Sequence, residues 1–311
     1  MKDWQKVEEI GSISSLKLMA FLLRICPHWL IVFIAYPISF GYWVCSKKAR
    51  KAIRIYSNHL YNTCGKKVNS WKLILSFSIT LIEKGESWSN KMKYKYFHFN
   101  DDDFTEYEEH LKTGKGAIVF VSHLGSSEQL RAISDEMINR HIGHPIPVLS
   151  IVDFDGTDKF NSMIKQINPS SMTNLMSIRD IDITSIEVME DVLSKGGLVI
   201  IAGDRIGAKN TNFTFLGEEA SFPEGAFLIA SLLNYPSFFI SSLRTKNFGW
   251  RRSYEIFCDK ISDGKVIESR KERRIAMNET MKKFVARLEN LTIKYSYQWY
   301  NFYNFWSLEN D

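Results

Sequence analysis

Cysteine is scarce in this 311-residue sequence, and the few cysteines form no recognisable framework. They are Cys26, Cys45, Cys64 and Cys258, with no metal-ligand spacing between them, which predicts free thiols in a reducing compartment. The sequence also has no H-E-x-x-H motif, no P-loop, no G-x-G-x-x-G turn after a strand and no G-x-S-x-G elbow. A metal, a nucleotide cofactor and a serine nucleophile therefore have no support, and we expect no cofactor.

An excess of charge of one sign is absent as well. The net charge is only +5 and no basic stripe accompanies it, so we expect no nucleic acid among the partners. Hydrophobic residues make up 45% and charged residues 24% of the chain, as in globular proteins. Internal repeats and low-complexity linkers are missing too. The length therefore fits one large domain, or one domain with an appended segment.

No apolar run is both long and unbroken. The longest uncharged stretch, residues 27–46, has about the twenty residues needed to cross a bilayer, but Pro37 and Gly41 interrupt it. A basic start followed by a small-residue cleavage site is absent, which argues against a removed signal peptide. A basic cluster follows directly, and such a cluster keeps its side of an apolar segment in the cytoplasm and attracts anionic lipid. Its members are Lys47, Lys48, Arg50, Lys51 and Arg54.

We therefore expect residues 1–90 to form a helical, membrane-associating region and residues 91–311 an α/β domain, unless the two form one continuous domain. The apolar segment can either cross the membrane or lie on it, and the sequence leaves both options open. The alternative is a pair of amphipathic helices packed on the domain, with the basic residues on a solvated face.

One stretch organises the rest of the chain. Residues 117–121 are apolar throughout and predict a buried strand. His123 lies at the end of this strand, and Gly125 allows a tight turn after it. Ser126 and Gln129 match the S-x-x-Q pattern of a capping box, which predicts that a helix starts there.

His123 and Glu128 carry the chemistry that this stretch suggests. A strand–turn–helix connection can fold the first helical turn back over the strand end, so that the Glu128 carboxylate reaches one imidazole nitrogen of His123. A carboxylate that fixes the tautomer of a histidine and stabilises its protonated form makes a general base. The alternative is structural: His123 ends a strand and Glu128 complements the helix dipole.

Apolar runs of strand length alternate with helical segments further along the chain. This alternation predicts an α/β fold with a mostly parallel sheet flanked by helices. Active sites of such sheets collect at the C-terminal strand ends. His123 and Asp204 both follow predicted strands, so we expect them to share one cleft. The predicted strands cover residues 117–121, 147–152, 175–178, 198–202, 237–243 and 254–257, and the predicted helices residues 160–167, 183–193 and 228–233.

Four short blocks occur in a fixed order along the chain. They are His123-x4-Glu128, Gly203-Asp204-Arg205, Phe215-Leu216-Gly217 and Phe222-Pro223-Glu224-Gly225. Their order and spacing resemble the lysophospholipid acyltransferase superfamily, and more narrowly its lipid A late-acyltransferase branch and related predicted bacterial acyltransferases. The resemblance runs over most of the chain. It implies a glycerolipid acyltransferase-like α/β fold and acyl transfer from an acyl carrier protein or coenzyme A thioester, without an acyl-enzyme, to a hydroxyl of a lipid or glycolipid.

The resemblance also implies roles for the first two blocks. His123 would be the general base and Glu128 the residue that orients it and stabilises its charge. Asp204 and Arg205 would shape the acceptor site, where Arg205 could bind a phosphate or the phosphopantetheine of the carrier bidentately. Taken without the resemblance, the same Asp204–Arg205 pair could be a surface ion pair of little consequence.

The fourth block carries a departure from the family pattern. Glu224 and Gly225 match part of the phosphate-binding F-P-E-G block of glycerophosphate acyltransferases, which makes them implied substrate-binding residues. That block normally continues Thr-Arg, but here Ala226 and Phe227 follow, which puts specific binding of glycerol 3-phosphate in doubt. Without the resemblance, this block could be only a turn.

The sequence is compatible with three functions. The first is an acyltransferase of the lipid A biosynthesis type at the cytoplasmic face of a bacterial inner membrane, with a carrier thioester and a membrane lipid as partners. Basic residues such as Arg251 and Arg252 can steer an acidic carrier protein to it. The second is a thioesterase or lipid hydrolase, in which water replaces the acceptor hydroxyl at the same His–Glu pair. The third is a non-catalytic carrier-docking or membrane-binding protein, which the presence of both His123 and Glu128 disfavours.

Overall fold

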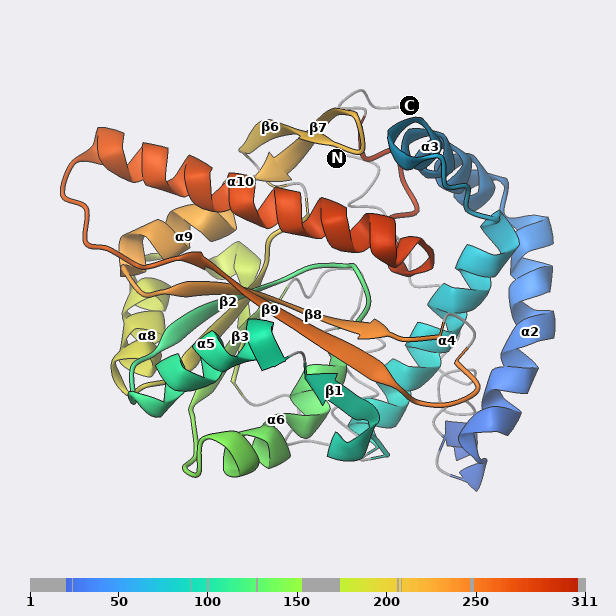
Figure 1. Cartoon of the computed structure of the whole chain (residues 1–311), viewed down its shortest axis with the longest axis horizontal. Helices are drawn as coiled ribbons and strands as arrows, with labels where there is room; N and C mark the ends of the chain where they lie inside the picture. Colours follow the sequence, from blue (N-terminus) through green and yellow to red (C-terminus); the bar gives the residue numbers. More distant parts are fainter. Residues whose placement is uncertain are drawn as a thin grey trace.

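A mostly parallel sheet forms the centre of the molecule (Figure 1). The computed structural model describes residues 21–306 apart from residues 24, 90, 100, 127, 153–173, 206, 208, 247 and 248. The strands of the sheet are β1 (Phe97–Phe99), β2 (Ala117–Val121), β3 (Val148–Val152), β4 (Leu175–Ser177), β5 (Leu198–Ala202), β8 (Ser237–Arg244) and β9 (Tyr254–Ser262). Their order is β1-β9-β8-β2-β5-β3-β4, and every neighbouring pair is parallel except β8 and β9. The predicted α/β class with a mostly parallel sheet is confirmed.

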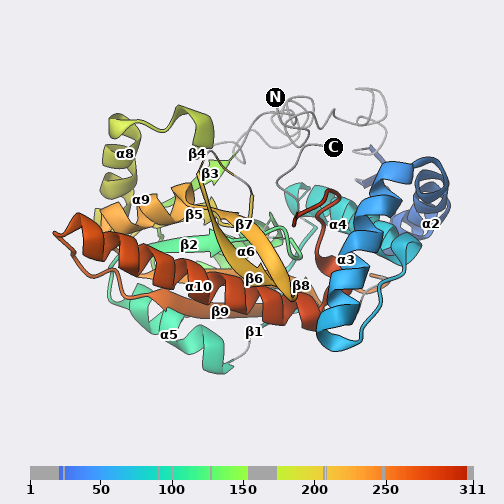
Figure 2. The same ribbon diagram turned by 90° about the horizontal axis from the view of Figure 1, so that it is seen from above.

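Helices cover both faces of this sheet (Figures 1 and 2). They are α5 (Asp101–Lys112), α6 (Glu128–His141), α8 (Ile183–Ser194), α9 (Gly225–Leu233) and α10 (Arg270–Lys294). In β2, Ile118 and Phe120 join the hydrophobic cluster under α8, α9 and α10, whereas Ala117 and Val119 join the cluster under α5 and α6. Successive side chains of a strand point to opposite faces, so a strand that is buried on both faces is apolar at every position.

The predicted strands from residue 117 onward are found near their predicted positions. β2 and β5 have the predicted limits, and β9 extends beyond the predicted residues 254–257 to Ser262. Helix α8 agrees with the prediction to within one residue, and α9 begins earlier than predicted, at Gly225. The predicted helix at residues 160–167 lies outside the described residues.

Two further strands, β6 (Asn210–Phe215) and β7 (Glu218–Pro223), form an antiparallel hairpin that the sequence did not predict. Its two-residue turn consists of Leu216 and Gly217, whose φ angles of 51° and 82° are both positive. Two positive φ values are typical of type I′ turns, where asparagine or glycine is usual. Leu216 takes this conformation with its side chain buried. The third sequence block therefore forms the end of β6 and the turn, and the fourth block forms the end of β7 and the start of α9.

Three long helices in the described part of the chain precede the sheet and pack at one end of it (Figure 1). They are α2 (His28–Cys45), α3 (Lys47–Cys64) and α4 (Ser70–Trp88). Side chains of α3 and α4 belong to the same hydrophobic cluster as one face of the sheet. Helix α2 lies outermost and packs along α4, and its inward face is buried there. The residues that pack between α2 and α4 include Ile31, Val32 and Ala35 of α2 and Leu75 and Ile79 of α4.

A buried ion cluster fixes the start of α2. The two ring nitrogens of His28 lie 3.0 Å from Glu86 Oε2 and 2.6 Å from the carbonyl oxygen of Gly249. Arg252 Nε donates to Glu86 Oε2 at 2.9 Å. Burial by itself raises the pKa of the Glu86 carboxyl, but the hydrogen bonds and charges of His28 and Arg252 outweigh burial and lower that pKa. Helix α2 is therefore held on the protein by a buried carboxylate as well as by apolar contacts.

The opposite face of α2 is apolar and exposed. Trp29 and Phe33 are 57% and 60% exposed, and Ile38, Phe40 and Val44 of the same helix are exposed as well. Phe21 and Ile25, which precede α2, are also exposed. By length and composition, α2 is the one helix among the described residues that could cross a membrane, with a mean hydropathy of 1.4 over 18 residues. The next helix, α3, exposes four basic side chains, Lys47, Lys48, Lys51 and Arg54. Helix α2 therefore has features of both sequence-based alternatives, a helix packed on the domain and a membrane-associating segment. One face packs on α4, and the other is an exposed apolar surface followed by the basic residues of α3.

Candidate active site

His123 and Asp204 follow two neighbouring parallel strands. In the register of β2 and β5, Val121 lies opposite Ala202. The Gly203 N–H donates to the Val121 carbonyl at 3.0 Å, which extends the pairing by one residue. The chain leaves both strands at the same level, so His123 and Asp204 emerge side by side at the C-terminal edge of the sheet. This is the edge where open α/β sheets hold their ligands.

Asp204 accepts two hydrogen bonds from His123. Asp204 Oδ1 lies 2.8 Å from the imidazole Nδ1, and Oδ2 accepts the backbone N–H of His123 at 2.7 Å. The prediction that these two residues lie together is confirmed. The Asp204 side chain is fully buried, whereas 33% of the His123 side chain is exposed. The carboxylate is therefore hidden behind an imidazole that solvent and ligands can reach.

The Asp204 carboxyl is ionised in this setting. Burial by itself raises its pKa, but attraction to His123, the two hydrogen bonds from His123 and the charge of Arg205 outweigh burial and lower the pKa below its ordinary value. A carboxyl with a lowered pKa contributes stability above its ordinary pKa and loses that contribution as the pH falls through the lower value of the folded state. Asp204 is thus a carboxylate throughout the neutral range.

The second imidazole nitrogen of His123 faces Arg205. Arg205 Nε lies 3.0 Å from His123 Nε2. A guanidinium N–H can only donate, so Nε2 must be the acceptor and carry no proton. The ring proton is then on Nδ1, where the Asp204 carboxylate accepts it. These contacts place the ring proton on Nδ1 and leave Nε2 as the nitrogen whose lone pair points away from Asp204.

Glu128 does not occupy the predicted position beside the imidazole. Helix α6 begins at Glu128, and the Glu128 carboxylate pairs with Lys84 of α4 at 3.2 Å. Asp204 binds the imidazole nitrogen that the prediction gave to Glu128. The prediction that Glu128 orients His123 by direct contact is therefore wrong, and Asp204, which was predicted to shape the acceptor site, has that position.

The turn at Gly125 explains this difference. Gly125 has a φ of 72°, and a Cβ atom there would lie 2.2 Å from the carbonyl oxygen of Ser242 in β8. The Ser126 N–H donates to the same carbonyl at 3.2 Å. The chain therefore leaves the strand end along β8, so that α6 begins beside α4 and not over His123. Only glycine combines this backbone conformation with so close an approach.

Gln129 also differs from its prediction. Its side chain is buried, with Nε2 donating to Glu83 Oε2 at 3.1 Å and Oε1 accepting from Ser242 Oγ at 3.0 Å. A capping box would turn this side chain back to the backbone of the N-cap residue. The predicted capping box is therefore wrong, because Gln129 joins α4 to β8 instead.

The C-terminal segment holds the loop that carries the histidine. The Gly125 N–H donates to the Gln298 carbonyl at 2.9 Å, and the Tyr300 N–H donates to the carbonyl of the histidine at 3.3 Å. Leu124 and Trp299 form an isolated β-bridge between these contacts, and both side chains are buried. The loop is therefore clamped between β8 on one side and the C-terminal segment on the other.

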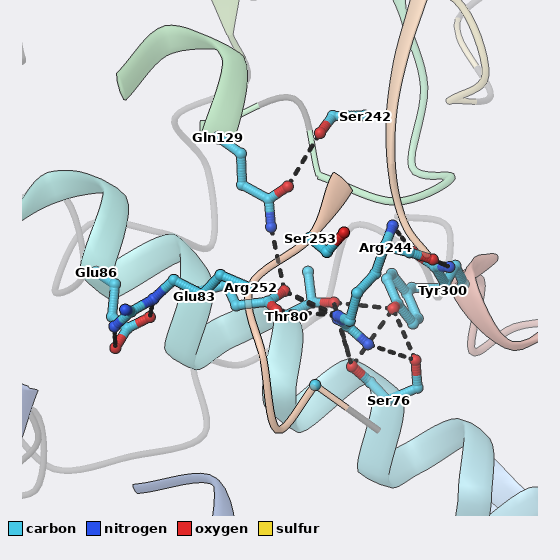
Figure 3. Close-up of polar contacts among 12 residues, drawn as sticks. Ser76, Thr80, Glu83, Glu86, Gln129, Ser242, Arg244, Arg252, Ser253 and Tyr300 are labelled. Carbon is cyan, nitrogen blue, oxygen red and sulfur yellow. Dashed lines mark hydrogen bonds and ion pairs between the residues drawn. The ribbon is translucent and has the colours of Figure 1, made fainter. Parts of the chain in front are cut away.

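A buried ion pair supports this clamp (Figure 3). Arg244, the last residue of β8, donates from Nε to both carboxylate oxygens of Glu83 in α4, at 3.0 and 3.1 Å. Both side chains are at most 2% exposed. The backbone of Arg244 exchanges two hydrogen bonds of 2.8 Å with the side-chain amide of Gln298. These three residues were not predicted from the sequence. The one sequence feature that pointed to them is an acidic residue, Glu83, inside the largely apolar run that forms α4.

Glu224 and Gly225 lie at the junction of β7 and α9. Thr211 donates from Oγ1 to Glu224 Oε1 at 2.7 Å, and Arg274 of α10 lies 3.6 Å from the same oxygen. The contacts described for Glu224 thus join the hairpin to α9 and α10, and none of them reaches His123. Substrate binding by Glu224 and Gly225 stays a prediction.

Comparison with known proteins identifies no relative that could assign a function to this site. No protein-family model matches the chain, and no curated protein matches it. Within the described parts of the chain, no group of three or more histidine, cysteine, aspartate or glutamate side chains could hold a metal ion. The four cysteines are free, as predicted. What the site offers is an imidazole, a buried carboxylate and an exposed guanidinium at the C-terminal edge of the sheet.

Proposed function

We propose that the chain is an acyltransferase that moves a fatty acyl group from a thioester of acyl carrier protein or coenzyme A to a hydroxyl of a lipid or glycolipid. The observation that carries the proposal is the partly exposed His123 imidazole, whose Nδ1 is bound by the buried Asp204 carboxylate. An imidazole held in this way can take a proton from a hydroxyl through Nε2. The resemblance of the four sequence blocks suggests the reaction class, since His123 and Asp204 belong to the first two blocks.

In the proposed reaction, His123 acts first as a base and then as an acid. Nε2 takes the proton of the acceptor hydroxyl while the hydroxyl oxygen attacks the carbonyl carbon of the thioester. The Asp204 carboxylate stabilises the imidazolium that forms. When the tetrahedral intermediate collapses, the carbon–sulfur bond breaks and Nε2 returns its proton to the departing thiolate. The acyl group thus passes directly to the acceptor, without an acyl-enzyme, and the imidazole returns to its neutral form.

We place this reaction at the cytoplasmic face of a bacterial inner membrane. The exposed apolar face of α2 lies next to the exposed basic residues of α3, and this combination favours anionic membrane surfaces. Helix α2 is also packed along α4 and joined to Glu86 through His28. We therefore propose that α2 stays on the protein and inserts only its apolar face into the membrane, parallel to the surface. A lipid acceptor could then reach the site without leaving the bilayer.

Product analysis tests the proposed reaction. The full-length protein in detergent micelles is incubated with radiolabelled acyl carrier protein thioester and total bacterial lipid. We expect a new labelled lipid with the wild-type protein and a rate at least about a hundredfold lower with His123→Ala, the size of a general-base contribution. His144→Ala is the matched control, because His144 is exposed on the surface and should leave the rate unchanged.

Two other outcomes are informative. Free fatty acid that is released by the wild-type protein but not by His123→Ala would make the protein a hydrolase that uses the same site. Equal products from the wild type and His123→Ala would contradict a role of His123 in either reaction.

Binding to vesicles tests the proposed membrane face. We expect the double substitution Trp29→Asp and Phe33→Asp to weaken binding to vesicles of anionic lipid by at least about tenfold, because two large apolar side chains no longer leave water on binding. Cosedimentation of the full-length protein with vesicles measures this change. The matched control is Ile183→Asp with Ile275→Asp, two side chains that are 80% and 55% exposed on α8 and α10. Unchanged binding of the α2 variant, or an equal loss in the control, would contradict insertion of α2.

A further inference from the structure

The hydrogen bond from Arg205 occupies the atom that the proposed reaction needs. Nε2 of a neutral imidazole has one lone pair, which lies in the plane of the ring, and Arg205 Nε donates to it at 3.0 Å. A substrate hydroxyl must donate to the same lone pair before His123 can take its proton. Arg205 and the acceptor hydroxyl therefore compete for one atom, and both cannot be bound there at once.

We propose that Arg205 masks His123 in the ligand-free protein, and that a phosphate-type oxyanion unmasks it by drawing the guanidinium away. The catalytic meaning of this switch rests on the proposed function, whereas the masking itself is a contact between two side chains. Asp204 is fully buried and its two oxygens accept hydrogen bonds from His123, and no hydrogen bond between Asp204 and Arg205 is described. The competing anion in this proposal is therefore one that a ligand brings.

The chemistry of the guanidinium selects this class of ligand. Arg205 is exposed, and the hydrogen bond described for its side chain is the one from Nε to His123. Guanidinium groups bind phosphate through two parallel charge-assisted hydrogen bonds, which are roughly twice as strong as neutral ones. A phosphate group can therefore displace the imidazole as the partner of Arg205, whereas a neutral hydroxyl or carbonyl group cannot.

In a group-transfer enzyme, masking of the base would limit hydrolysis of the donor. A thioester carrier has a phosphate in its phosphopantetheine arm, and many lipid acceptors have one in their headgroup. If His123 Nε2 is free only while such a phosphate binds Arg205, the imidazole does not activate water in the empty protein. The Arg205 contact would thus favour transfer over wasteful hydrolysis.

Chemical labelling of His123 tests the proposal without any turnover. Diethyl pyrocarbonate reacts with an imidazole nitrogen whose lone pair is free, and here Asp204 blocks Nδ1, so Nε2 is the reactive atom. The full-length protein in detergent micelles is labelled at one neutral pH, with and without inorganic phosphate, at equal ionic strength. Mass spectrometry of peptides gives the labelling of His123 relative to the exposed His144, a ratio that corrects for decay of the reagent.

We expect phosphate to raise the relative labelling rate of wild-type His123 by about fivefold, the factor for one hydrogen bond of about 1 kcal/mol. In Arg205→Gln, His123 should be labelled at the fast rate with and without phosphate. Arg205→Ala serves as a second variant that removes the guanidinium entirely. Equal labelling of wild type and both variants without phosphate would overturn the masking. Acceleration by phosphate in the variants as well would overturn the role of Arg205 in sensing it.

Two pairs of probes identify the source of the phosphate. Coenzyme A is compared with pantetheine, which lacks the phosphate, and vesicles that contain phosphatidic acid are compared with vesicles of phosphatidylcholine alone. Acceleration by coenzyme A points to the donor, and acceleration by phosphatidic acid points to the acceptor. Because labelling needs no acyl transfer, a failed transfer assay leaves this result intact, and a failed labelling test leaves the proposed function intact.

Discussion

Replacement of Arg244 by methionine is expected to lower the free energy of unfolding by about 3–5 kcal/mol, the usual cost of breaking a buried ion pair by removing one partner. Both Arg244 and Glu83 are almost fully buried, and the Glu83 carboxylate accepts hydrogen bonds from Nε and a terminal nitrogen of the arginine. Burial by itself lowers the pKa of Arg244, but Glu83 outweighs burial and raises it, so the arginine stays charged. In the variant, Glu83 would remain as a buried charge with the Gln129 amide as its described partner.

Urea denaturation in detergent micelles, followed by circular dichroism, measures this loss. The double variant Arg244→Met with Glu83→Leu should regain most of the stability, because no uncompensated charge remains in the interior. Arg140→Met is the matched control. Arg140 is 58% exposed and pairs with Glu136 at 2.7 Å on the surface of α6, and its removal should cost less than about 1 kcal/mol. A double variant no more stable than the single one would contradict the importance of charge compensation at this pair.

The central strands were predictable because each carries its own signal. β2 and β5 are buried on both faces, so every position is apolar, and each run ends where the side chains become polar. The hairpin of β6 and β7 lacked such a signal. Its turn holds Leu216 at a positive φ, a conformation in which asparagine or glycine is usual. Because leucine stands at this position, the sequence does not show the usual turn signal.

The candidate site was predictable in part for the same reason. His123 and Asp204 could be placed at strand ends from the sequence alone, and parallel strands of one sheet end at a common edge. That β2 and β5 are direct neighbours, which brings the two side chains to 2.8 Å, is a property of the strand order. The direction of the turn after His123 depends on the Ser242 carbonyl in β8, far away in the sequence, so the position of Glu128 could not be read from its spacing.

The residues that clamp the histidine loop were beyond the reach of sequence patterns. Glu83, Arg244 and Gln298 lie in three separate segments of the chain. Their structural role depends on the contacts between these segments, which the fold creates. Taken alone, a glutamate in a helix, an arginine after a strand and a glutamine near an aromatic segment are ordinary surface residues. A buried ion pair has no local signature, because its partners come from long-range topology.

The structure and the sequence pattern assign different carboxylates to His123. The structure places Asp204 at its Nδ1, whereas the sequence pattern predicted Glu128. Asp204→Asn should reduce the rate of the proposed acyl transfer by at least about a hundredfold, because an amide cannot stabilise the imidazolium and can favour the wrong tautomer. Glu128→Gln should keep the rate within about tenfold of the wild type, since Glu128 pairs with Lys84 and both side chains are 28% exposed.

The measurement is therefore the initial rate of labelled lipid formation by the wild type, Asp204→Asn and Glu128→Gln under identical conditions. Near-ultraviolet circular dichroism of each variant checks that its tertiary structure is retained. A large loss in Asp204→Asn with a small loss in Glu128→Gln is the result we predict. The reverse order, with Glu128→Gln inactive and Asp204→Asn close to wild type, would contradict the assignment of Asp204 as the partner of the base.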